Sequence, residues 1–95
     1  MRLDRDLIRG ILEREEDAWD ELFARYGKKL RRHLVRTVRD EAAAEDLLQE
    51  VLLRVWKSAG QWREEGSLQA WLYRIATNLA LNAAEWRNIK REWED

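Results

Sequence analysis

The chain has 95 residues, a formal net charge of −1, 39% charged residues and no cysteine. This length fits one small domain, residues 1–95, with a modest core, and the lack of cysteine excludes a disulfide framework and thiolate chemistry. The near-neutral charge gives no general attraction to nucleic acid, and neither a secretory leader nor an apolar run of roughly 18 residues is present, so we expect a cytoplasmic protein without membrane attachment.

The chain contains no proline, and its apolar residues recur at helical spacing. We therefore predict an all-α fold, a compact bundle of about four helices. The first helix is expected over residues 4–13, and its inward residues would be Leu7, Ile8, Ile11 and Leu12.

A second helix is expected over residues 17–38, with Asp17 as a suitable N-cap. Gly27 lies inside it at a cost of about 1 kcal/mol relative to alanine, which indicates a bend or close packing. The predicted inward face consists of aromatic and leucine residues, namely Trp19, Phe23, Tyr26, Leu30 and Leu34.

The same helix carries a basic block without an acid in it: Lys28, Lys29, Arg31, Arg32, Arg36 and Arg39. Most of these residues lie opposite the predicted inward face, so a solubilising surface is the favoured interpretation. The alternative is a patch that faces phosphates or the acidic start of the next helix.

The third helix is expected from residue 40 to about residue 60, where Gly60 is a plausible C-terminal cap. On a helical wheel its apolar residues form one stripe that a domain would bury, made of Ala44, Leu47, Leu48, Val51 and Val55. The stripe predicts which side of this helix faces the core.

A second apolar set on the third helix falls outside that stripe. Leu53 points almost directly away from it, while Leu52 and Trp56 lie at its edge or beyond. Isolated exposed leucines are common, but large apolar side chains mixed with Asp46 and Gln49 are typical of a protein-binding surface. We therefore predict that a partner protein covers this face, with Trp56 as its anchor.

Ser67 is placed to cap a fourth helix, whose buried stripe would be Leu68, Leu72, Ile75, Leu79 and Trp86. On the same helix Asn78 and Asn82 share one side with Trp71. An amide offers a donor and an acceptor together, which is what reading a base edge requires, although asparagine is also a common solvated helix residue.

Three successive strings carry a family resemblance: AEDLLQEVLLRVW, QWREEGS and LQAWLYRIATNLALN. They resemble region 2 of the bacterial sigma factors, specifically the extracytoplasmic-function group, and the earlier string DAWDELFARYGKKLRRHL fits the opening helix of that family. The resemblance implies a domain that docks on the clamp helices of the RNA polymerase β′ subunit. It also implies recognition and melting of the promoter −10 element.

By this resemblance, the polymerase-binding residues would be Asp46, Gln49, Glu50, Leu52, Leu53 and Trp56. Trp62, Arg63 and Ser67 would shape a pocket for a base flipped out of the non-template strand. Arg74, Asn78 and Asn82 would read or position the strand. For Trp62 the alternative is a plug that packs the connection onto the core, and the two roles are compatible.

The chain also departs from the family pattern. After Asn82 it reads AAEWRNIKREWED, with Glu85 where an arginine is usual, so we expect weak DNA affinity. The region 4 domain of the family is absent from this chain. An anti-sigma factor is a possible further partner. The alternative function is a sigma-like interaction module without DNA-melting activity.

The residues give no support for catalysis or for a bound cofactor. His33 is the single histidine, and without cysteine it leaves neither a nucleophile triad nor a metal-ligand cluster. Pairs of neighbouring acidic residues lie in polar stretches of the sequence, where exposure to solvent accounts for their charge without a catalytic role. We therefore expect a binding protein with no enzyme activity, no metal and no cofactor.

Overall fold

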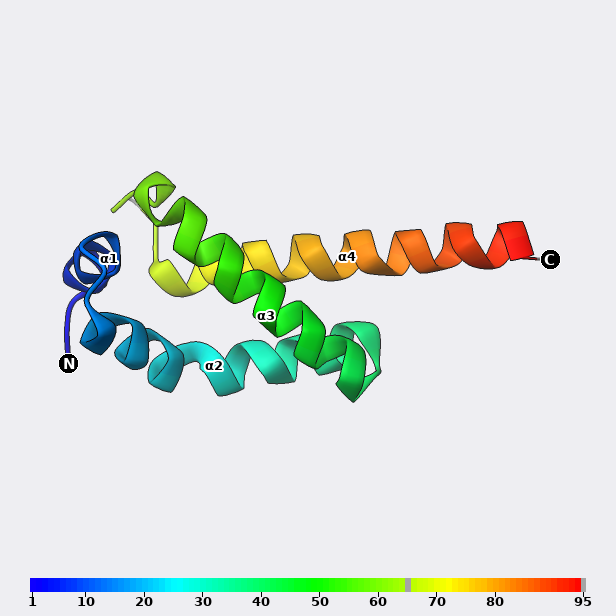
Figure 1. Cartoon of the computed structure of the whole chain (residues 1–95), viewed down its shortest axis with the longest axis horizontal. Helices are drawn as coiled ribbons and strands as arrows, with labels where there is room; N and C mark the ends of the chain where they lie inside the picture. The colour runs from blue at the N-terminus through cyan, green and yellow to red at the C-terminus, as the bar shows by residue number, and fades with distance from the viewer. Residues whose placement is uncertain (65, 95) are drawn as a thin grey trace.

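The computed structural model describes residues 1–64 and 66–94, and for residues 86–94 it describes the backbone alone. Its elements are four helices and one short 3-10 turn, in the order α1 (Asp4–Leu12), α2 (Glu16–Val38), α3 (Glu41–Ser58), η1 (Ala59–Gln61) and α4 (Leu68–Glu94). Figure 1 shows α3 crossing α4, and α4 extending past the other helices toward the C-terminus. The predicted all-α bundle is confirmed.

The turn between α1 and α2 differs from the prediction. α2 begins at Glu16 after Glu15, which makes no side-chain capping hydrogen bond, so Asp17 lies inside the first turn and is not the N-cap. There its charge still complements the positive end of the helix. Leu12 is 53% exposed because α1 ends at this residue, so the prediction of an inward Leu12 is wrong.

The caps of α3 and α4 follow the sequence more closely. The Asp40 carboxylate accepts a hydrogen bond from the Ala43 amide at 3.1 Å, and the Ser67 hydroxyl accepts one from the Ala70 amide at 3.0 Å. The predicted glycine cap at Gly60 is wrong. α3 runs directly into η1, and no described glycine has a positive φ.

The core lies between the four helices, where α2 packs on α1, α3 and α4 and where α3 packs on α4, and α1 contributes Leu7, Ile8 and Ile11. On α2 the buried line is Ala18, Leu22, Tyr26, Leu30 and Leu34. Phe23 is 49% exposed, so its predicted inward position is wrong. On α3 the predicted stripe is confirmed, with Leu47 half-buried.

The buried line of α4 is shifted from the prediction. It follows Leu68, Leu72, Ala76 and Ala80, while Ile75 and Leu79 are half-buried at its edge. Two alanines at the contact leave room for the neighbouring helices, which moves the larger side chains outward. The Trp86 side chain, predicted to be buried, lies outside the described residues.

Two glycines in helices behave differently. A Cβ on Gly10 would lie 2.6 Å from the Ala18 Cβ, so glycine allows α1 to approach α2. A Cβ on Gly27 would meet only the Phe23 ring at 3.5 Å, which is ordinary contact. Gly27 therefore does not mark the close packing that the sequence suggested.

His33 joins α2 to α4. Its Nε2 lies 2.8 Å from the Thr77 hydroxyl, and its ring meets the Tyr73 ring edge-on with centroids 5.0 Å apart. These contacts account for the lone histidine as a packing residue. In the part of the chain that the structure describes, no helix is long and apolar enough to span a membrane, and no group of acidic and histidine side chains is arranged to hold a metal ion.

Candidate functional site

Of the six residues predicted for the outer face of α3, four are exposed, one is half-buried and one is buried. Asp46, Gln49 and Glu50 are exposed, and the Leu53 side chain is 49% exposed. Leu52 is 9% exposed and belongs to the core. Because both α2 and α4 cover α3, its buried stripe is wider than a single helical wheel indicates, and the predicted exposure of Leu52 is wrong.

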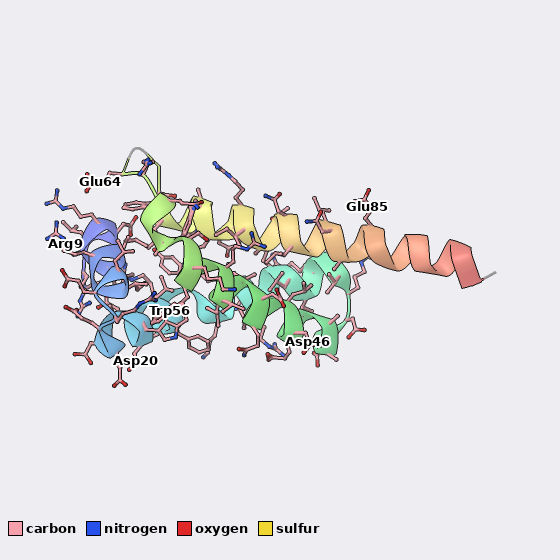
Figure 2. All side chains as sticks on the ribbon, turned by 45° about the horizontal axis from the view of Figure 1, so that its top comes forward. Arg9, Asp20, Asp46, Trp56, Glu64 and Glu85 are labelled. Atoms are coloured by element: carbon pink, nitrogen blue, oxygen red, sulfur yellow. The ribbon has the colours of Figure 1, made fainter. Side chains whose placement is uncertain are left out.

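Trp56 is half-buried and is held by its own domain. Its ring meets the Trp19 ring edge-on, with centroids 5.3 Å apart, and the Arg14 guanidinium lies 3.9 Å from the ring centroid. Both rings line a hollow of about 370 Å³ with an acidic rim of Glu15, Glu16 and Asp20. Figure 2 labels Trp56 and Asp20 at this end of the molecule.

A second hollow of about 400 Å³ lies between α3 and α4. Asn78 and Asn82 line it together with Trp71, as their spacing on the helix predicts. The opposite side is formed by the end of α3 and by η1, which contribute Arg54, Ser58 and Gln61. The hollow thus combines side-chain amides, a guanidinium and an indole ring, which are the groups that bind an unstacked base.

A third hollow of about 400 Å³ adjoins the second one on the outer face of α3. Glu50, Leu53 and Lys57 line it, together with the same Arg54, Ser58 and Gln61. We call these last three residues the shared wall. The Ser58 hydroxyl donates to the Arg54 carbonyl, which ties two of its members together. The shared wall therefore separates Leu53 from Asn78 and Asn82.

The other predicted DNA-binding residues do not line the second hollow. Trp62 packs against the core, has a buried indole nitrogen without a hydrogen-bond partner among the described residues, and faces Leu3, Asp4 and Arg5. The packing role predicted for Trp62 is confirmed. Arg63, Ser67 and Arg74 are exposed, and the hydroxyl of Ser67 caps α4.

Sequence reasoning did not single out the three residues of the shared wall, which line both hollows. Each is polar and exposed or half-exposed on its own element, and nothing in one helix shows that α4 brings asparagines beside it. The sequence offered one indication of this wall: Arg54 and Ser58 lie one helical turn apart near the end of the predicted helix.

The basic block is mostly solvated, but Arg31 is paired. Its Nε donates to the Glu45 carboxylate at 2.8 Å, which joins α2 to α3. This hydrogen bond raises the pKa of the Arg31 guanidinium, which stays charged. The alternative interpretation of the block, a contact with the acidic start of the third helix, is thus correct for this residue.

Residues 22–92 match the family Sigma-70 region 2. Sigma-H factor of Pseudomonas aeruginosa is 33% identical over 79 residues, covering 83% of this chain and 41% of that protein. The extracytoplasmic-function factor SigG of Mycobacterium tuberculosis is 45% identical over 62 residues, covering 65% of this chain and 17% of that protein. CarQ of Myxococcus xanthus is 41% identical over 68 residues, covering 72% of this chain and 39% of that protein.

The chain thus spans less than half the length of these relatives. Among solved structures, an engineered region 2 of sigmaE in complex with GTAAAA superposes with a TM-score of 0.81 at 24% identity, over 94% of this chain and 93% of that one. That likeness shows the same fold. Fold, family match and relatives agree with the sequence resemblance, and the chain belongs to the sigma-70 region 2 family as a domain of the extracytoplasmic-function type.

Proposed function

We propose that this chain is the part of a sigma factor that binds the β′ clamp helices of RNA polymerase and that recognises and melts the promoter −10 element. The observation that carries the proposal is the shared wall. It places an exposed leucine surface and an asparagine-lined hollow back to back, so one domain can hold polymerase and a displaced strand at the same time.

The polymerase contact is proposed for the outer face of α3. Leu53 supplies apolar area at the centre, Asp46 and Glu50 supply negative charge on one side of it, and Arg54 and Lys57 supply positive charge on the other. This combination fits a partner helix whose apolar residues are flanked by basic residues where they meet Asp46 and Glu50. Trp56 supports the same face at one end, although Trp19 and Arg14 already cover part of its ring.

The DNA contact is proposed for the hollow between α3 and α4. Amide groups of Asn78 and Asn82 can pair with the edge of an extruded base, while the Trp71 ring offers a stacking surface. Extruding a base costs a few kcal/mol, which the new contacts offset, so melting proceeds by binding without a chemical step. The complex of the related fold with GTAAAA supports this assignment.

The exposed residues around the hollow have a supporting role in this proposal. Arg63 and Arg74 are accessible to phosphates of the same strand, and Ser67 holds the start of α4 in place. Trp62 acts through packing of the connection, because its ring lies on the side that faces α1. Glu85 opposes phosphate binding, so polymerase has to supply most of the affinity.

The test is transcription by core polymerase with this chain joined to a region 4 domain, scored on a library of −10 sequences. We expect transcription that depends on a defined −10 motif and is lost when both asparagines are changed to alanine. Polymerase binding that is lost in Leu53→Ser, together with no dependence on the asparagines or on the −10 sequence, would instead establish the interaction module without melting activity.

A further inference from the structure

The geometry points to Asp4 as a positioning residue for the proposed base-reading hollow. Its carboxylate ties α1 to the first residue of α4, and α1 in turn braces the connection that carries Gln61. This inference rests on the proposed function. It concerns a helix that lies outside residues 22–92, which match the family.

Asp4 contacts α4 directly. Its Oδ2 accepts a hydrogen bond from the Leu68 amide at 3.1 Å. Leu68 is the first residue of α4, where an amide has no acceptor inside the helix. A carboxylate there also complements the helix dipole. Asp4 and Ser67 therefore hold two of the first amides of the helix that carries Asn78 and Asn82.

Asp4 is itself fixed from α2 by Arg25. The Arg25 Nη1 lies 3.8 Å from the Asp4 Oδ1, and its Nη2 donates to the Arg2 carbonyl at 2.9 Å. Glu21 pairs with Arg25 and accepts from the Arg2 amide at 3.0 Å. The Arg25 side chain is only 15% exposed and the Asp4 side chain is 36% exposed, so these contacts are partly shielded from solvent and restrict the position of Asp4.

α1 packs against η1, the short turn that ends at Gln61, and the N-terminal segment lies beside the residues before and after Gln61 in the chain. Leu12 has a methyl group 3.7 Å from where a Cβ on Gly60 would lie, and Trp62 shares a hollow with Leu3 and Asp4. Gln61 lies between these two contacts and contributes to the shared wall. A loss of the Asp4 contact would therefore loosen the wall on one side of the hollow and the start of α4 on the other.

The experiment compares three variants of the whole chain. Asp4→Ala removes the acceptor for the Leu68 amide, and Asp4→Asn keeps an acceptor but removes the charge. Ile8→Val is the matched control, because Ile8 is a buried residue of the same helix, 5% exposed, and its truncation lowers thermal stability without removing the hydrogen bond between Asp4 and the Leu68 amide.

The first measurement is hydrogen exchange of the Leu68 amide in the free chain. We expect exchange roughly tenfold faster in Asp4→Ala, an intermediate rate in Asp4→Asn, which keeps an acceptor but loses the ion pair with Arg25, and a rate close to the original in Ile8→Val. Equal acceleration in Asp4→Ala and Ile8→Val would overturn the inference, and so would a rate in Asp4→Asn equal to that in Asp4→Ala. This measurement does not depend on DNA binding.

The second measurement is the affinity of the single-stranded DNA GTAAAA for the chain bound to core polymerase. We expect roughly tenfold weaker binding for Asp4→Ala, partial recovery in Asp4→Asn, and unchanged polymerase binding in all three variants. Equal losses of DNA affinity in Asp4→Ala and Ile8→Val would overturn the positioning role. If the unmodified chain binds no DNA in any sequence, the proposed function fails, while the exchange measurement still decides whether Asp4 fixes α4.

Discussion

The Trp19 ring meets the Trp56 ring edge-on, with centroids 5.3 Å apart and planes at 86°. This pair joins the start of α2 to the end of α3, and Arg14 covers the Trp56 ring at 3.9 Å. Trp56 therefore stabilises the fold and supports the proposed polymerase surface at once. A change at Trp56 therefore alters both stability and the surface. Leu53 is 49% exposed, so a change there tests the surface with little effect on stability.

Leu53→Ser is expected to weaken binding to core polymerase about tenfold or more, because it removes the apolar centre of the outer face of α3. The thermal stability of the Leu53→Ser variant is expected to change little, since the Leu53 side chain is 49% exposed. Leu81→Ser is the matched control, because Leu81 is 56% exposed on α4. Equal losses of polymerase affinity in the two variants would contradict the assignment of this face.

Trp56→Ala is expected to lower the free energy of unfolding by about 2 kcal/mol, because it removes an aromatic pair, a cation–π contact and half-buried apolar area. Chemical denaturation measures this change. A double-mutant cycle with Trp19→Ala is expected to give a coupling of about 1 kcal/mol. A coupling near zero would show that the edge-on contact contributes nothing to stability.

Asn78→Ala and Asn82→Ala are expected to weaken the binding of single-stranded −10 DNA to the polymerase complex by about 1–3 kcal/mol each, if each amide pairs with a base edge. Both side chains are exposed, so the melting temperature is expected to stay the same. Gln69→Ala removes an exposed amide from the same helix outside the hollow and serves as control. A loss in Gln69→Ala of the same size would argue against base reading by the asparagines.

Glu85→Arg is expected to strengthen DNA binding and to make it more sensitive to salt, because it replaces a repelling charge near Asn82 with one that contacts phosphate. The slope of log affinity against log salt concentration is expected to steepen by about 0.7 for a single strand. Asp20→Arg makes the same charge change at the other end of the molecule (Figure 2). If Asp20→Arg gives the same slope, the gain reflects net charge and not a phosphate contact at Glu85.

The two helical glycines give a pair of opposite expectations. Gly10→Ala is expected to destabilise the fold by about 1–3 kcal/mol, because the new Cβ would lie 2.6 Å from the Ala18 Cβ. Gly27→Ala is expected to stabilise it by up to about 1 kcal/mol, since alanine favours the helix and meets only ordinary contacts at 3.5 Å. Thermal melts of the two variants check both, and a stable Gly10→Ala variant would mean that α1 can shift away from α2.

Much of the fold was predictable because each helix carries its own signals. Periodic apolar residues gave the four helices, and local capping chemistry at Asp40 and Ser67 gave two of their starts. The side-by-side placement of Asn78 and Asn82 also followed from spacing within one helix. These features depend on residues close together in the chain.

Some errors concerned helix ends, at Leu12, Asp17 and Gly60, and the errors in burial on α3 and α4 arose where helices meet. Leu52 is buried because two helices cover α3, and Ala76 and Ala80 displace Ile75 and Leu79 from the centre of the α4 contact. The shared wall likewise exists only because α4 lies beside the end of α3. A helical wheel of one segment contains no information on the direction from which its neighbours approach.

The position of Arg54, Ser58 and Gln61 between the two hollows has a thermodynamic consequence. If polymerase seated on one side shifts these side chains, it changes the affinity of the other side for a base. Linkage then requires that an occupied base site change the affinity for polymerase by the same factor and in the same direction. A domain built in this way would bind a base with one affinity when free and with another when a partner occupies the opposite side of the wall.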